Sequence, residues 1–326
     1  MCSEYEKEDV EKNLTIGHDN EFIYPDYLGG QVMSLIRIKD ALFFTDMATR
    51  SIHSVSPQES DSVLTIGSRG RGPGEYEFPL HLRAVNSEQL AWSDISKSEI
   101  NIMNTQGDFI STITHPFGGG RNFSFGDEHL LVTPGFSHLL NLVALEDETQ
   151  RMELFEISPK DRAFLSMIPG GGGIITGNKA YAAMPHKPVF HIYDIDTETI
   201  SEVVPLAFES YHEAFSTYYE NVERPSDIDT EEVMESYLII NRVFPIHLED
   251  ETFILTEASY KDSILLYVFD HQFNLVFESV SRFSPLGTDG TSIYGVQTIF
   301  DTEAESDEVT LSIKQTDISE RISLSD

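Results

Sequence analysis

Short hydrophobic runs alternate with polar turns along most of this chain. The clearest copies place an aspartate, Asp46 or Asp94, at the end of the first run. Their paired runs occupy residues 42–46 and 51–55, then residues 90–94 and 99–103. Alternation with a period of two predicts β-strands, and two such strands joined by a polar turn predict a hairpin. The pattern therefore predicts a repeated antiparallel unit.

The unit recurs six times. Its copies start near residues 42, 90, 130, 181, 253 and 309, at intervals of 48, 40, 51, 72 and 56 residues. A blade of a β-propeller has four strands and a repeat of about 40 to 50 residues. We therefore predict an all-β fold, a six-bladed β-propeller, in which two intervals carry extra residues.

The longest interval contains a segment, at about residues 208–240, in which the pattern changes toward helical spacing. Its aromatic residues fall on one side of the predicted helix: Tyr211, Phe215, Tyr218 and Tyr219. Asp229, followed three residues later by Glu232, forms a capping box for a second short helix. These features predict a helical insertion between blades four and five, whose tyrosines add a side contact for a protein partner.

A propeller must also hide its edge strands, and we expect the two ends of the chain to do this together. Residues 13–17 resemble residues 62–67, the outer strand of the first legible blade. We therefore predict that the strand at 13–17 closes the last blade, whose other strands come from residues 293–324. On this interpretation residues 1–12 form a flexible acidic tether and residues 13–326 form one propeller domain.

The net charge of the chain limits the classes of partner that it is expected to bind. The sequence has 55 acidic and 21 basic side chains and a formal net charge of -34. The phosphate attraction that dominates nucleic-acid binding becomes repulsion at this charge, so nucleic acid is excluded as a partner, and broad contact with anionic lipid is disfavoured. No apolar run approaches the roughly 18 residues of a membrane-spanning helix. An unknown protein or a small polar ligand remains as the expected partner.

The single cysteine, Cys2, stands directly behind Met1 and ahead of a short acidic run. One cysteine cannot form an intramolecular disulfide or a cysteine-rich metal site. A mature bacterial lipoprotein begins with a lipidated cysteine followed by a flexible tether, and this start is similar. We therefore predict lipid attachment at Cys2 and outer-membrane anchoring, with membrane contact through the lipid alone. The alternative is a cytoplasmic protein with an incidental cysteine.

The most specific motif is glycine-rich and spans residues 66–79. Its turn-forming residues are Gly67, Gly70, Gly72, Pro73, Gly74, Glu75 and Pro79. Glycines permit backbone conformations that other residues avoid, and proline fixes its own torsion, so this segment can cross from an outer strand back to the central axis. A phosphate-binding loop would instead need a Lys-Ser/Thr pair opening a helix.

This motif resembles that of the TolB-like six-bladed propeller lipoproteins, and more loosely that of the NHL propellers. The resemblance implies a six-bladed propeller, a lipidated N-terminal cysteine and a location in the cell envelope. It supplies no catalytic residue. Only one blade junction carries the full motif, and the helical insertion departs from the family pattern.

Two kinds of channel chemistry are open to such a fold. Scattered oxygen ligands could bind calcium in the channel, as in lactonase-type propellers, with Asp46, Asp94 and Asn101 as candidates. Because these residues stand at strand ends, turns that they cap explain them equally well. No Gly-x-Ser-x-Gly nucleophile motif is present. An enzyme of this class, a calcium-dependent lactonase-like hydrolase, therefore stays as the alternative function.

The other possibility is ligand binding without catalysis or cofactor. Cationic residues are scarce in this chain, yet several flank the predicted inner strands: Arg37, His81, Arg83, Arg121 and Arg242. Their position predicts a funnel that accepts an anionic or polyhydroxylated ligand against an acidic exterior. The alternative, equally open, is that they are solvated residues at the rim or partners of nearby carboxylates. The main functional prediction is a non-enzymatic cell-envelope lipoprotein that acts as a binding or protein-interaction module.

Overall fold

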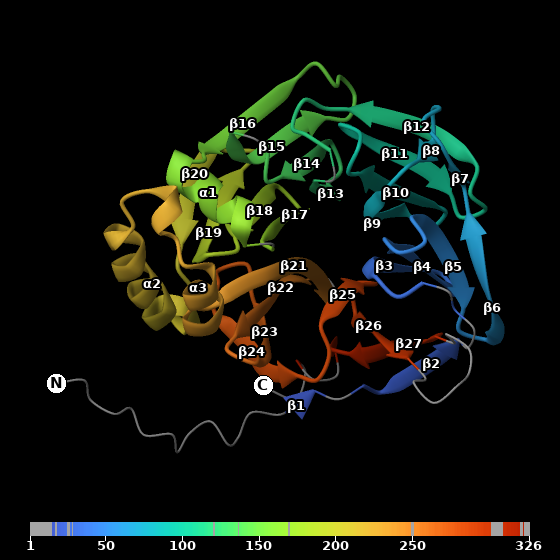
Figure 1. Cartoon of the computed structure of the whole chain (residues 1–326). Coiled ribbons are helices and arrows are strands. Elements are labelled where there is room, and N and C mark those ends of the chain that lie inside the picture. The colour runs from blue at the N-terminus through green and yellow to red at the C-terminus, as the bar shows by residue number, and fades with distance from the viewer. Residues whose placement is uncertain are drawn as a thin grey trace.

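The computed structural model shows six twisted sheets arranged around a central channel (Figure 1). It describes residues 15–319 and residue 322, except residues 17, 25–26, 28, 120, 136, 169, 249–250 and 301–308. Cys2 and the tether predicted for residues 1–12 lie outside the described residues. The predicted fold class, a six-bladed β-propeller with helices inserted before blade five, is confirmed.

Blades 1 to 3 are four-stranded antiparallel meanders that follow one another along the chain. Blade 1 contains β3 (Val32–Ile38), β4 (Ala41–Asp46), β5 (Ser51–Ser56) and β6 (Glu59–Ile66). Blade 2 contains β9 (Pro79–Asn86), β10 (Gln89–Asp94), β11 (Glu99–Asn104) and β12 (Phe109–Thr114). Blade 3 contains β13 (Asn122–Phe125), β14 (His129–Thr133), β15 (His138–Ala144) and β16 (Arg151–Glu156). In each, the first strand lines the channel.

Blades 4 to 6 continue this order. Blade 4 contains β17 (Gly172–Thr176), β18 (Lys179–Met184), β19 (Lys187–Asp194) and β20 (Thr199–Val203). Blade 5 contains β21 (Ile239–Leu248), β22 (Glu251–Tyr260), β23 (Ser263–Phe269) and β24 (Leu275–Ser281). Blade 6 contains β25 (Pro285–Thr288), β26 (Ser292–Phe300) and β27 (Val309–Asp317), and its fourth strand comes from the N-terminal part of the chain.

An N-terminal strand closes the ring, as predicted, but it is a different strand from the one expected. The closing strand is β2 (Asn20–Tyr24), which pairs antiparallel with β27 from Asn20↔Gln315 to Tyr24↔Leu311. The segment predicted for this role, residues 13–17, contains β1 (Thr15–Ile16), which instead pairs in parallel with β24 of blade 5. That prediction was wrong because both segments look like strands, and their partners depend on where the chain ends meet.

The sixth repeat was also placed one strand late. Val309 begins β27, the third strand of blade 6, whereas the strand equivalent to β4 and β10 is β26, which begins at Ser292. The second strands of the six blades thus begin at residues 41, 89, 129, 179, 251 and 292. With this register only the interval that contains the helices is long.

The core lies between the blades rather than within them. A cluster of buried hydrophobic side chains fills each interface between neighbouring blades in the described part of the chain. Phe43 of blade 1 packs in one cluster with Trp92 of blade 2, and Tyr294 of blade 6 packs in another with Leu35 of blade 1. Because neighbours cover both faces of a sheet, second strands such as β10 are buried at nearly every position. Their sequences therefore read as short apolar runs.

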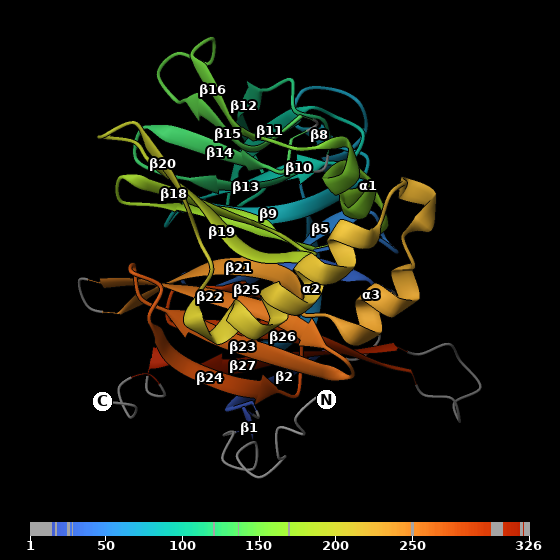
Figure 2. The same cartoon turned by 90° about the vertical axis from the view of Figure 1, so that its left-hand side faces the viewer.

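Three α-helices gather on one face of the ring, beside blades 4 and 5 (Figures 1 and 2). They are α1 (Pro159–Met167), α2 (Glu209–Asn221) and α3 (Thr230–Ser236), with 3-10 turns at Leu206–Phe208 and Pro225–Asp227. Half of the capping box predicted for α3 is confirmed, since the Asp229 carboxylate accepts a hydrogen bond from the Glu232 backbone N–H at 3.0 Å. The Asp229 backbone N–H donates to the Tyr218 hydroxyl at 2.9 Å rather than to the Glu232 side chain. Phe215 is buried, and Tyr218 and Tyr219 pack around it, so this aromatic side of α2 faces the protein.

Helix α1, between blades 3 and 4, was not predicted. Its start carries recognisable signals: Ser158 caps it, with the hydroxyl accepting from the Asp161 backbone N–H, and Pro159 occupies the first turn. None of the helices in the described residues is both long and apolar enough to cross a membrane.

Candidate functional site

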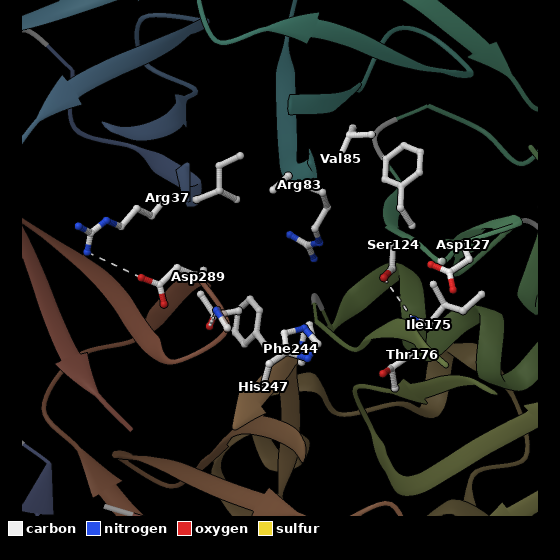
Figure 3. A pocket seen from close by; sticks show the side chains of 18 of the residues that line it. Arg37, Arg83, Val85, Ser124, Asp127, Ile175, Thr176, Phe244, His247 and Asp289 are labelled. Atoms are coloured by element: carbon white, nitrogen blue, oxygen red, sulfur yellow. Dashed lines mark hydrogen bonds and ion pairs between the residues drawn. The ribbon is translucent and has the colours of Figure 1, made fainter. Parts of the chain in front are cut away.

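The central channel opens into a cavity at each end. The first residues of the inner strands, together with Leu165 of α1, surround a cavity of about 400 Å³, which we call the helical end. The last residues of the same strands surround a cavity of about 410 Å³, which we call the far end (Figure 3). Arg83 and Phe244 contribute to both cavities, so they stand where the two ends meet.

The helical end collects cationic side chains from three blades. Its charged or titratable lining residues are His81, Arg83, Arg121 and Arg242, joined by the amides of Asn122 and Asn241. No Asp or Glu among the described residues lines this cavity. In a chain with 55 acidic residues, such a wall creates a local positive potential within a negatively charged protein.

Arg83 is the cation that lines both cavities. Its Nη1 donates to the Leu82 carbonyl at 2.8 Å and its Nη2 donates to the Asn122 Oδ1 at 2.6 Å. No carboxylate of the described residues forms an ion pair with it. Burial, with a smaller contribution from the charge of Arg242, lowers the pKa of Arg83 to about 10. The guanidinium therefore remains charged at neutral pH.

Arg242, in contrast, already has a carboxylate partner. Its Nη1 donates to the Glu257 Oε2 at 2.8 Å, to the Ser284 hydroxyl at 2.9 Å and to the Pro285 carbonyl at 3.0 Å. Glu257 is 1% exposed, and its second oxygen accepts from the Ser284 hydroxyl at 2.6 Å. This pair links blade 5 to the start of blade 6, and Glu257 compensates the charge of Arg242.

Arg121 lies just before β13, and its Nε donates to the Phe117 carbonyl at 3.2 Å. Burial lowers the pKa of this guanidinium. His81 lies near the start of β9, on the same wall. The structure thus brings His81, Arg83, Arg121 and Arg242 together at one end of the channel.

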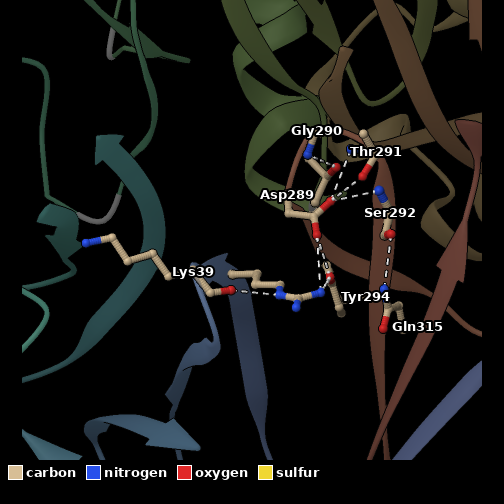
Figure 4. A network of polar contacts seen from close by, with 9 residues as sticks. Lys39, Asp289, Gly290, Thr291, Ser292, Tyr294 and Gln315 are labelled. Carbon is tan, nitrogen blue, oxygen red and sulfur yellow. Dashed lines mark hydrogen bonds and ion pairs between the residues drawn. The ribbon is translucent and has the colours of Figure 1, made fainter. Parts of the chain in front are cut away.

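Arg37, the remaining candidate, lies at the far end (Figure 3). It donates to the Tyr294 hydroxyl at 3.2 Å and lies 3.8 Å from the Asp289 carboxylate. Asp289 in turn accepts from the Tyr294 hydroxyl at 2.6 Å and from the backbone of the turn at Thr291 and Ser292 (Figure 4). Arg37 is therefore part of a network that joins blades 1 and 6, at the opposite end of the channel from His81, Arg121 and Arg242.

The candidate oxygen ligands lie outside both cavities. Asp46, which is 0% exposed, accepts hydrogen bonds from four backbone N–H groups and the Tyr27 hydroxyl. Asp94 accepts from the backbone N–H groups of Glu77 and Phe78 in the same manner. Asn101 accepts from the Thr112 hydroxyl at 2.7 Å. No group of three or more His, Cys, Asp or Glu side chains that could hold a metal ion occurs in the described part of the chain.

The glycine-rich motif connects blade 1 to blade 2. It contains β7 (Ser68–Arg69) and β8 (Glu75–Tyr76), which pair in parallel. Gly67 and Gly74 have φ values of 70° and 74°, the left-handed region that favours glycine. Within the loop, the Glu75 carboxylate accepts a hydrogen bond from the Gly72 backbone N–H at 2.7 Å. The Lys97 ammonium group donates to the backbone carbonyls of Gly72 and Glu75. Pro79 then begins β9, whose later residues include His81 and Arg83.

The fold and this cavity define a class: a six-bladed β-propeller whose channel has one cationic end. No protein-family model matches the sequence, and no curated protein matches it.

Solved structures resemble the chain in fold. One is a protein from Bacteroides fragilis that is described as exported, with a TM-score of 0.57 and 13% identity over 93% of this chain and 98% of that chain. A DUF4221 family member from Bacteroides vulgatus has a TM-score of 0.53 and 10% identity over 92% of this chain and 98% of that chain. The WD40 repeats of RRP9 have a TM-score of 0.50 and 12% identity, covering 90% and 97% of the two chains. At these identities the likeness shows the fold alone.

Proposed function

We propose that this chain is a non-enzymatic binding lipoprotein of the bacterial cell envelope, similar to the TolB-like propellers, and that the helical end of its channel binds a small anionic ligand. The observation that carries this proposal is the wall formed by His81, Arg83, Arg121 and Arg242, which includes no carboxylate among the described lining residues. A concave site with a few convergent polar groups is the usual form of a small-molecule site. Its positive charge favours anions over neutral or cationic ligands.

The rigid frame supports binding rather than chemistry. Inner strands from different blades position the cationic side chains, and the blade interfaces behind them are closely packed. The candidate calcium ligands lie outside both cavities and bind neighbouring groups of the chain, which supports the binding module over the calcium-dependent alternative: Asp46, Asp94 and Asn101. The location proposal draws on Cys2 and on the similar protein from Bacteroides fragilis that is described as exported.

Small anions are expected to raise the melting temperature of the protein. The measurement is a thermal melt with acetate, citrate, phosphate or sulfate against glucose, at constant ionic strength. A ligand present at 100 times its Kd stabilises the folded state by about 2.7 kcal/mol. That corresponds to a rise of about 4 °C for a chain of 326 residues.

The anion effect is expected to disappear in a double variant, Arg83→Gln with Arg121→Gln, and to persist in Arg37→Gln, which removes a cation from the far end. Calcium and EDTA are tested as additional conditions, and neither is expected to change the melting temperature. A shift with glucose but with none of the anions would contradict the proposal, and a shift of several degrees with calcium would favour the hydrolase.

The lipid anchor is tested in cells that express the gene with its own upstream coding sequence. We expect the protein to incorporate an alkyne-labelled fatty acid and to fractionate with membranes, since Cys2 supplies the thiol for lipid attachment. The Cys2→Ala variant should lose both the label and the membrane association, whereas the matched Ser3→Ala variant should keep them. Equal labelling of the wild type and Cys2→Ala would remove the basis for the lipoprotein proposal.

A further inference from the structure

Resting on the proposed function, we infer that the ligand of the helical end is a monocarboxylate with an apolar body, and that Arg83 binds its carboxylate through two parallel N–H···O bonds. Three properties of the cavity lead to this class of ligand: the hydrogen bonds that Arg83 leaves open, the charge that its surroundings leave uncompensated, and the apolar part of the wall.

A guanidinium group carries five N–H donors in one plane. For Arg83 the structure matches one donor of Nη1 with the Leu82 carbonyl and one of Nη2 with the Asn122 amide oxygen. Both acceptors are neutral, so they hold the plane of the group without neutralising it. The remaining donors can engage a carboxylate in the two-point arrangement that suits the geometry of arginine.

The charge balance favours a single negative charge at Arg83. Glu257 compensates Arg242, the guanidinium whose charge acts on Arg83. Arg83 itself has no ion-pair partner among the described residues. A half-buried cation of this kind is stabilised by one opposite charge in direct contact. The carboxylate of a ligand supplies that charge, whereas a neutral ligand does not.

Part of the wall is apolar and indicates what the carboxylate is attached to. Its hydrophobic members come from five blades and from α1: Met33, Leu80, Pro134, Leu165, Phe244 and Leu286. Phe244, like Arg83, lines both cavities. A compact phosphate or sulfate would leave this surface in contact with water, while an aliphatic or aromatic acid buries it. The cavity of about 400 Å³ is within the range of small-molecule sites.

The test measures Kd by titration calorimetry on the full chain with benzoate, benzamide and phosphate. Benzamide has the shape of benzoate without its charge, and phosphate has charge without an apolar body. We expect benzoate to bind at least about 10 times more tightly than benzamide, the difference typical of a hydrogen bond to a charged group. We also expect it to bind more tightly than phosphate, which buries no apolar surface. Arg83→Lys keeps the charge but loses the two-point geometry, so it should weaken benzoate binding by a similar factor. Arg83→Gln should abolish it.

Two variants control the experiment. Arg37→Gln changes the far end and should leave the Kd for benzoate unchanged. Leu165→Ala retains Arg83 but removes apolar surface on α1, and it should weaken benzoate while leaving the weak binding of phosphate unaltered. Thermal melts of all variants establish that they fold.

The outcomes separate this inference from the proposed function. Tighter binding of phosphate than of benzoate, retained in Arg83→Lys, would overturn the monocarboxylate but keep an anion-binding channel. If no anion bound and Arg83→Gln behaved like the wild type with every probe, both would fall.

Discussion

Removal of residues 1–24 is expected to lower the melting temperature by about 10 °C or more and to promote association. This truncation deletes β2, the fourth strand of blade 6, which pairs with β27 over five residues. It also deletes Tyr24, which is 2% exposed and packs in the cluster between blades 6 and 1. Loss of a buried aromatic side chain costs about 3 to 5 kcal/mol, and each kcal/mol corresponds to about 1.5 °C in a chain of 326 residues. Loss of the strand pairing with β27 adds to this shift.

Association is expected because the truncation leaves β27 as an unpaired edge, and unpaired edges pair with other chains. Two shorter truncations are the controls. Deletion of residues 1–12 removes only the predicted tether, and deletion of residues 1–17 also removes β1, a two-residue strand. Both should melt within about 2 °C of the full chain. The measurements are circular dichroism melts and size-exclusion chromatography. Equal melting of all three truncations would show that the ring does not depend on β2.

Replacement of Asp46 by alanine should have an effect of similar size. The Asp46 Oδ2 accepts from the Tyr27 hydroxyl at 2.8 Å and from the Gly30 and Gln31 backbone N–H groups, and its Oδ1 accepts from those of Ala48 and Thr49. The substitution leaves these buried donors without acceptors. Each unsatisfied buried group costs about 1 to 3 kcal/mol, so we expect a loss of about 3 to 5 kcal/mol after water replaces some of the bonds.

Urea denaturation measures this loss as a change in the free energy of unfolding. Asp262→Ala, which changes an exposed aspartate in the turn between β22 and β23 of blade 5, is the matched control and should change it by less than about 0.5 kcal/mol. The loss of stability in Asp46→Ala should be the same with calcium and with EDTA, because the carboxylate oxygens accept hydrogen bonds from the backbone. A loss that appeared only in the presence of calcium would instead identify Asp46 as a metal ligand.

Much of the fold could be predicted from local patterns. The repeat spacing indicated six blades because each blade is built from a consecutive stretch of chain with its own strands and turns. The equivalence of Asp46 and Asp94 was visible for the same reason. Each aspartate ends the second strand of its blade and accepts hydrogen bonds from the backbone of the loop that precedes that blade. The cap at Asp229 is likewise a local feature of three residues.

The candidate site was only partly predictable. The cationic residues beside the inner strands were identified, but the sequence could not say that Arg37 lies at the opposite end of the channel from His81 and Arg242. That separation depends on whether a residue stands near the start or the end of its strand. A shift of two or three residues in a strand boundary moves a side chain from one cavity to the other, and sequence patterns do not define boundaries so closely. Leu165 was missed because α1 was missed.

The sequence by itself determined the number of blades, the strand-forming segments, the acidic character and the scarcity of cations, because these follow from composition and from neighbours along the chain. Only the tertiary structure decided which N-terminal strand closes the ring, which arginine keeps an uncompensated charge, and which end of the channel is cationic. The physical reason is that each of these depends on groups far apart in sequence: β2 on β27, Arg242 on Glu257 and Ser284, and Arg83 on Asn122.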